Sequence, residues 1–213
     1  MSKRDIGRSC RAEKLAVVLN RLVQFTAKRW LLIVNSALFV QAVLPSVPPV
    51  LMITGHASVA RLLYTMFRPL CHQLPERSFF LFGPQFAYRF DELQRLVGLD
   101  VALRYIGDPV IGYKMAVCQR DAATFAALSL SGLVFAALRR STTPLSLKAF
   151  FLVSAPMAID GLGQLLRLWE STWWSRVITG GLFGTACVWL TFPYIAVGMR
   201  DVLRAASPAS PGR

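Results

Sequence analysis

Long apolar segments constrain this 213-residue chain more than any other feature. Four of them, residues 30–53, 115–138, 147–166 and 174–199, are close to the roughly 20 residues with which a helix crosses the hydrocarbon core of a bilayer. The composition agrees, because only 16% of the residues are charged, against about 25% in ordinary soluble domains. The sequence therefore predicts an all-α membrane protein with four transmembrane helices.

The first apolar segment is expected to be kinked. Pro45, Pro48 and Pro49 interrupt residues 30–53, and a proline removes a helical hydrogen bond and clashes with the preceding turn. Residues 1–29 are basic and place apolar side chains at helical spacing, which predicts a cytoplasmic amphipathic segment. Residues 200–213 are predicted to be a disordered cytoplasmic tail.

The distribution of basic residues predicts the orientation. With four spans, fourteen of the 24 Lys and Arg residues fall on one side, where only three acidic residues oppose them. The positive-inside rule assigns that side, and both termini, to the cytoplasm. We therefore expect a multi-pass protein of the cell (plasma) membrane, such as the bacterial inner membrane, with the lipid bilayer as its partner. The net charge of +13 is spread along the chain beside apolar runs, so no nucleic-acid binding is predicted.

The connection between the first two spans, residues 54–114, is too long for an incidental loop. Within it, residues 56–70 place apolar side chains at helical spacing with Arg61 on the other side. An arginine near the middle of the bilayer would cost several kcal/mol. The sequence therefore predicts a helix lying in the interface, followed by the rest of a small helical cap on the outer face.

Two short polar clusters, Cys71-His72 and Cys118 to Asp121, lie at the edges of apolar segments, and the predicted topology brings both to the outer membrane edge. Cys71 and Cys118 could form a disulfide there, because that compartment is oxidising. Together with His72 and Asp121, the two thiols also form a ligand set for zinc or another divalent metal. No C-x-x-C pair is present, so a disulfide, a metal site and a catalytic or unpaired thiol all stay open.

A second set of polar side chains falls inside the apolar segments. Asp160 and Gln164 line one face of the third predicted span, and a carboxylate inside a membrane is a functional-site hypothesis. The expected partners of Asp160 are Arg120 and Arg176. A structural ion pair that keeps three helices in register explains the same residues equally well.

Gly180 and Gly184 in the fourth predicted span have G-x-x-x-G spacing. Small residues at this spacing let two helix backbones approach closely. The sequence predicts packing within the chain here, with a homo-oligomer as the alternative.

Three motifs occur in order, CHQLPERSFFLFG, GYKMAVCQRD, and PMAIDGLGQLL followed by ESTWWSRVITGGLFG. Together they resemble an uncharacterised family of bacterial and archaeal integral membrane proteins, domain of unknown function 2085. The resemblance covers about residues 30–195. It implies that the family's motif positions are occupied here by Cys71, His72, Arg77, Cys118, Arg120, Asp160, Gln164 and Arg176. The family has no established activity, so the resemblance implies no reaction.

Three functions fit these features. The first is an integral membrane protein whose outer-face Cys/His/Arg/Asp site binds a metal or a small ligand. The second is a structural or accessory subunit of a larger membrane complex, with a Cys71–Cys118 disulfide. The third is a membrane thiol–disulfide or quinone oxidoreductase, although the chain lacks the C-x-x-C pair and the second cysteine pair of such a relay. No catalytic residue can be named from the sequence.

Overall fold

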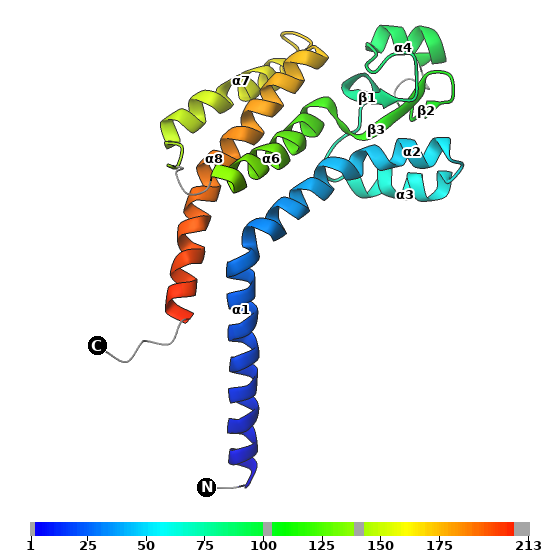
Figure 1. Cartoon of the computed structure of the whole chain (residues 1–213). Coiled ribbons are helices and arrows are strands. Elements are labelled where there is room, and N and C mark those ends of the chain that lie inside the picture. Colours follow the sequence, from blue (N-terminus) through cyan, green and yellow to red (C-terminus); the bar gives the residue numbers. More distant parts are fainter. Residues whose placement is uncertain (1–2, 100–103, 139–142, 207–213) are drawn as a thin grey trace.

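The computed structural model describes residues 3–99, 104–138 and 143–206 (Figure 1). Helix α1 (Lys3–Val43) continues through a short 3-10 turn, η1 (Leu44–Ser46), into α2 (Val47–Ile53). The prolines predicted to kink this segment lie in η1 and in the first turn of α2. The N–H that proline lacks is not needed for a hydrogen bond in the first turn of a helix, so η1 and α2 continue the helix through these prolines. The last residues of the predicted tail, 207–213, lie outside the described residues.

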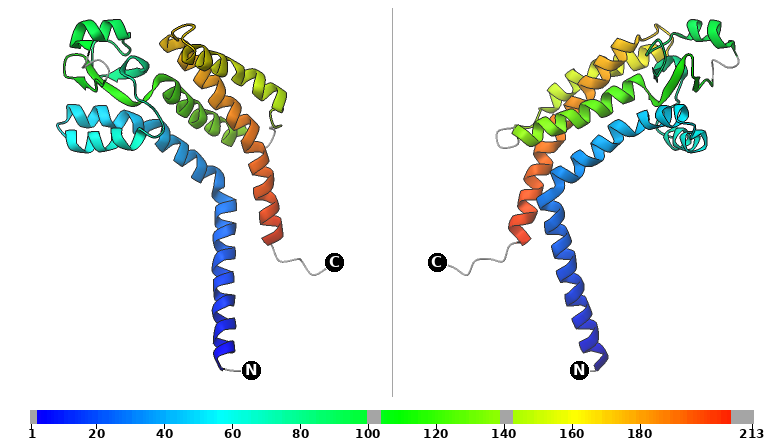
Figure 2. Two further views of the ribbon diagram at one scale, coloured as in Figure 1. Left: turned by 180° about the vertical axis from the view of Figure 1, so that it is seen from behind. Right: turned by 45° about the vertical axis from the view of Figure 1, so that its right-hand side comes forward.

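The remaining long helices form a packed group. Helices α6 (Gln119–Leu138), α7 (Leu147–Leu165) and α8 (Trp173–Ala206) run side by side, with α8 in contact with both others and with α1 (Figures 1 and 2). Four buried side chains fill the space where α1, α6 and α8 meet: Leu31, Phe135, Val188 and Phe192. The helices thus enclose a narrow core and leave most of their apolar surface exposed, as lipid-facing helices do.

Three helical stretches among the described residues are long and apolar enough to cross a membrane: Glu13–Ile53, Gln119–Leu138 and Trp173–Ala206. Helix α7 has 19 residues but does not reach the same hydropathy, because Lys148, Asp160 and Gln164 lower it. The helical membrane class is therefore confirmed, whereas the count of four spans is not.

The predicted helical cap, residues 54–114, also takes part in a small sheet that continues to residue 118. It contains α3 (Ala57–Phe67), a 3-10 turn η2 (Pro75–Arg77) and α4 (Phe90–Val97), but also three strands, β1 (Ser78–Leu81), β2 (Gly107–Asp108) and β3 (Gly112–Cys118). These strands form an antiparallel sheet in the order β1-β3-β2. Residues 100–103 of the predicted cap lie outside the described residues.

Strand β3 replaces the beginning of the predicted second span, residues 115–118. Its pairing with β1 sets Ser78 opposite Cys118 and Phe80 opposite Lys114. At Gly112 the backbone has φ +92°, and a Cβ there would lie 2.6 Å from the carbonyl oxygen of Leu81. A residue with a side chain would clash, so this glycine allows the two strands to approach. Long-range strand pairing therefore overrides the apolar pattern that favoured a helix.

Helix α3 lies antiparallel beside α2 (Figure 1). It buries Ala60, Tyr64 and Phe67, while Leu62 and Met66 stay exposed on another side. One apolar face therefore packs on the protein and a second remains uncovered. The position of this helix at a membrane interface stays a prediction.

Candidate functional site

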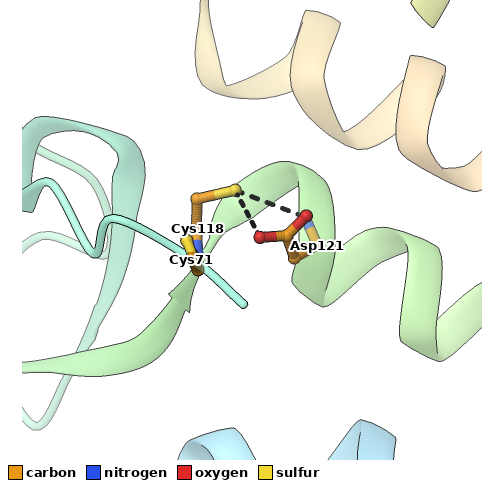
Figure 3. A group of neighbouring side chains, drawn as sticks. All are labelled: Cys71, Cys118 and Asp121. Atoms are coloured by element: carbon orange, nitrogen blue, oxygen red, sulfur yellow. Dashed lines mark hydrogen bonds between the residues drawn. The ribbon is translucent and has the colours of Figure 1, made fainter. Parts of the chain in front are cut away.

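Cys71, Cys118 and Asp121 come together where β3 ends and α6 begins (Figure 3). Cys118 is the last residue of the strand, Asp121 lies in the first turn of the helix, and Cys71 follows α3. Their two sulfur atoms and one carboxylate oxygen all lie within 4.8 Å of one another. The Cys118 thiol donates to Asp121 Oδ2 across 3.2 Å. Two of the three sequence motifs therefore meet at one point.

Backbone donors surround the sulfur atoms of this thiol–carboxylate group. The N–H of Cys118 donates to Cys71 Sγ over 3.2 Å, and the N–H of Asp121 donates to Cys118 Sγ over 3.4 Å. The hydrogen bond with the Cys118 side chain lowers the pKa of Cys71 below its usual range. The same contact, together with burial, raises the pKa of Cys118. The two thiols therefore differ, because the pKa of Cys71 is lowered and that of Cys118 is raised.

The remaining candidates for this group lie elsewhere. Cys71, Cys118 and Cys187 are free thiols, so no disulfide joins them in the described part of the chain. His72 is exposed and is not a member of the thiol–carboxylate group. Of the four metal ligands expected from the sequence, Cys71, Cys118 and Asp121 therefore lie together and His72 does not.

Asp160 pairs with Arg120, the first of its two expected partners. The guanidinium of Arg120 on α6 contacts one carboxylate oxygen of Asp160 on α7, and Ser175 Oγ on α8 donates to the other at 2.9 Å. Both charged side chains are largely buried. These two contacts link three helices at one level, which is the arrangement of the structural ion pair.

Arg176 instead connects α8 to the cap. Its Nη1 donates to Gln119 Oε1 at 2.9 Å and to the backbone carbonyl of Glu76 at 3.3 Å. Gln119 is itself buried, and its Nε2 donates to the carbonyl of Ser78 at 3.1 Å. The sequence interpretation passed over Gln119, although an amide between a cysteine and an arginine in the second motif was a signal.

Lys114 is a second residue that the sequence interpretation missed as a site candidate. It is buried in β3 and donates from Nζ to the carbonyl of Gln73 at 2.6 Å. Burial lowers the pKa of Lys114 to about 8. Gln73 has φ +54°, and its Nε2 donates to the carbonyl of Tyr64 at 2.7 Å, so this network fixes the chain directly after Cys71. A lysine inside an apolar run was the available signal.

Arg77, Gln164 and Arg176 line one cavity of about 430 Å³ between η2, α4 and the α7–α8 turn. Trp173 and Trp174, at the start of α8, lie on the same wall. A neighbouring cavity of about 500 Å³ shares Arg77 and Gln164. Neither Arg120 nor Asp160 is among the lining residues of either cavity. The predicted set of polar candidates therefore separates into an ion pair and a cavity.

Gly180 and Gly184 face α6. A Cβ at Gly180 would lie 2.5 Å from the carbonyl oxygen of Arg120, and one at Gly184 would lie 2.6 Å from that of Thr124. Thr124 Oγ1 also donates to the carbonyl of Gly180 at 3.2 Å. Both glycines thus lie at a close helix–helix contact within the chain.

Comparison with known proteins gives the same family as the motifs. Residues 110–190 match the model of the family described as "Predicted membrane protein (DUF2085)". The expected family is thereby confirmed for this stretch. An uncharacterised protein from Methanocaldococcus jannaschii is 28% identical over 133 residues, which are 62% of this chain and 67% of the relative. No solved structure matches the chain. The DUF2085 stretch contains Cys118, Arg120, Asp121, Asp160, Gln164 and Arg176.

Proposed function

We propose that this integral membrane protein binds a soft divalent cation, zinc first among them, through Cys71, Cys118 and Asp121. The observation that carries the proposal is the separation of at most 4.8 Å among the three donor atoms. Zinc binds thiolate sulfur at about 2.3 Å and carboxylate oxygen at about 2.0–2.2 Å, so two donors on one ion lie roughly 3.5 Å apart. The distance of 3.2 Å between Cys118 Sγ and Asp121 Oδ2 is close to that value.

The surroundings of the two thiols support a metal further. Both sulfur atoms accept backbone N–H groups, which favour the thiolate that a metal requires. Cys118 holds a proton against Asp121, and a cation would replace that proton. Zinc takes four ligands, and a water or an added ligand would supply the fourth.

We place this site on the outer face of the cell membrane, with α1, α6, α7 and α8 as four spans and both termini in the cytoplasm. The basic residues of the N-terminal segment, of the α6–α7 connection and of the tail support that orientation. Helix α7, with 19 residues, is about 28 Å long, which is close to the hydrocarbon thickness.

Labelling of intact cells tests the topology. Leu96→Cys adds a thiol on α4 and Val202→Cys adds one near the end of α8, and both positions are exposed. With the four native cysteines replaced by serine, a membrane-impermeant maleimide should modify the first variant in intact cells and the second only after permeabilisation. The opposite pattern would overturn the orientation.

A Cys71–Cys118 disulfide in a structural or accessory subunit is the second candidate. The same proximity of the two sulfur atoms favours it, because cysteines on β3 and beside α3 would tie the cap to α6. This staple needs no contribution from Asp121.

Metal analysis and thiol labelling of the purified protein separate the two candidates. We expect about one zinc per chain, lost in Cys71→Ser, Cys118→Ser and Asp121→Asn but kept in Cys187→Ser and His72→Ala. The last two variants are matched controls, because neither residue belongs to the thiol–carboxylate group. Protein without metal, whose Cys71 and Cys118 react with maleimide only after reduction, would replace the metal site by the disulfide.

A further inference from the structure

Arg176 is a buried cation without a carboxylate partner. Only 6% of its surface is exposed, yet no acidic side chain among the described residues lies within ion-pair distance of it. Its Nη1 contacts an amide oxygen and a backbone carbonyl, which are neutral, and its Nε is buried without any acceptor. A guanidinium in this position is costly unless an anion compensates it.

The cavity of about 430 Å³ beside Arg176 has the composition of an anion site. Arg77 and Arg89 lie on its wall, and Arg77 makes only a long contact of 3.9 Å with Glu76. The first residues of the 34-residue helix α8 also line it, so the positive end of that helix dipole faces the cavity. Glu76 and Glu170 are the acidic residues of the wall, and Arg89 already pairs with Asp91 at 3.1 Å, so Arg176 and the helix terminus are the positive groups of the wall without a described ion-pair partner.

Aromatic side chains form the other part of the wall. Tyr88, Phe90, Trp173 and Trp174 line the cavity, and both tryptophans are exposed in part. Tryptophan is enriched at the level of lipid headgroups, because its ring is apolar and its N–H is polar. A ligand with one charged end and one apolar end would therefore contact both kinds of wall.

We propose that this cavity binds a phosphate group, held by Arg176 and Arg77, with the apolar part of its carrier against Trp173 and Trp174. Arginine matches phosphate because its planar fork of N–H donors can contact two oxygens at once. A lipid headgroup and a soluble phosphate present the same oxygens. The proposal is independent of the metal site, since no lining residue of the cavity belongs to the thiol–carboxylate group.

Native mass spectrometry and tryptophan fluorescence of the purified full chain in detergent test this proposal. The probes are inorganic phosphate, dihexanoyl phosphatidic acid and, as an uncharged control, dihexanoylglycerol. We expect a saturable change in tryptophan fluorescence and a bound mass with dihexanoyl phosphatidic acid but not with dihexanoylglycerol. Binding of inorganic phosphate as well would assign a soluble phosphate as a ligand, whereas binding of the phosphatidic acid alone would assign a headgroup.

Variants connect the binding to the cavity. Arg77→Gln is the principal variant, because its side chain is 38% exposed and supports no described hydrogen-bond network, and affinity should fall at least tenfold. Arg176→Gln should abolish binding, but it also breaks the contacts with Gln119 and Glu76. Arg95→Gln on α4 is the matched control outside the cavity, and it should bind as the wild type does. Equal affinity in wild type, Arg77→Gln and Arg95→Gln, or no binding of either phosphate probe, would overturn the proposal.

Discussion

Alanine at Gly180 or at Gly181 separates helix packing from helix propensity. A Cβ at position 180 would lie 2.5 Å from the carbonyl oxygen of Arg120 and 3.0 Å from Thr124 Oγ1, both on α6. A Cβ at position 181 would meet nothing within 4 Å. The two variants change the same helix by the same atoms at adjacent positions, so Gly181→Ala is the control for Gly180→Ala.

The expected magnitudes follow from these contacts. Replacing Gly by Ala within a helix stabilises it by about 1 kcal/mol, and this gain is common to both variants. Only Gly180→Ala forces α6 and α8 apart against a backbone atom, which cannot rotate away, and overpacking of this kind costs typically about 1–3 kcal/mol. The difference between the two variants therefore isolates the packing cost of about 1–3 kcal/mol.

Thermal unfolding in a mild detergent, followed by tryptophan fluorescence or by loss of the monodisperse peak, measures this difference. For a chain of this length, 1 kcal/mol shifts the midpoint by roughly 2–4 °C, so Gly181→Ala should unfold roughly 2–12 °C above Gly180→Ala. Equal midpoints would refute the close α6–α8 contact at Gly180. A change in oligomeric size in Gly180→Ala, with an unchanged midpoint, would assign the glycines to a homo-oligomer instead.

Three further outcomes are expected. Asp160→Asn should lower the free energy of unfolding by about 3–5 kcal/mol, because it leaves Arg120 buried without its partner. The double variant with Arg120→Gln should regain part of this free energy, and chemical denaturation measures both. The pKa of Lys114 is about 8 in the folded chain, and its ordinary value is 10.5. Between these pH values the unfolded chain binds more protons, so the free energy of unfolding should rise by about 3 kcal/mol from pH 8 to 10.5. Lys114→Met should flatten this rise in pH-dependent melting curves. Zinc affinity, measured by chelator competition, should weaken as the pH falls, because protons compete for the thiol of Cys118, whose pKa is raised. A flat pH profile in the wild type, or a zinc affinity independent of pH, would contradict the corresponding statement.

The helices could be predicted from the sequence because their signals are local. Apolar runs of about twenty residues and helical spacing mark α6, α7 and α8 without knowledge of the rest of the chain. The same local patterns misassign β3, whose conformation depends on pairing with a strand 32 to 40 residues earlier in sequence, from Leu81 opposite Tyr113 to Ser78 opposite Cys118. The small sheet could not be predicted, because no window of the sequence contains both strands.

The candidate site shows the same division between local and distant information. Motif positions identified Cys71, Cys118 and Asp160, since polar groups beside apolar segments are conspicuous. Whether Arg120 or Arg176 pairs with Asp160 depends on the rotation of three helices about their axes. The order of residues along the chain does not give that rotation. The contact of Lys114 with Gln73 was missed for a related reason, since both residues need a fold to become neighbours.

The two proposed sites meet at a single peptide bond. Cys118 ends β3 and contributes a thiol to the metal group, while Gln119 begins α6 and contacts Arg176 beside the cavity. Their tests are separable, because Cys71 belongs to the thiol–carboxylate group and not to the cavity wall, and Arg77 belongs to the wall and not to that group. Loss of zinc with retained phosphate binding would thus leave the cavity proposal intact, and the reverse result would leave the metal proposal intact.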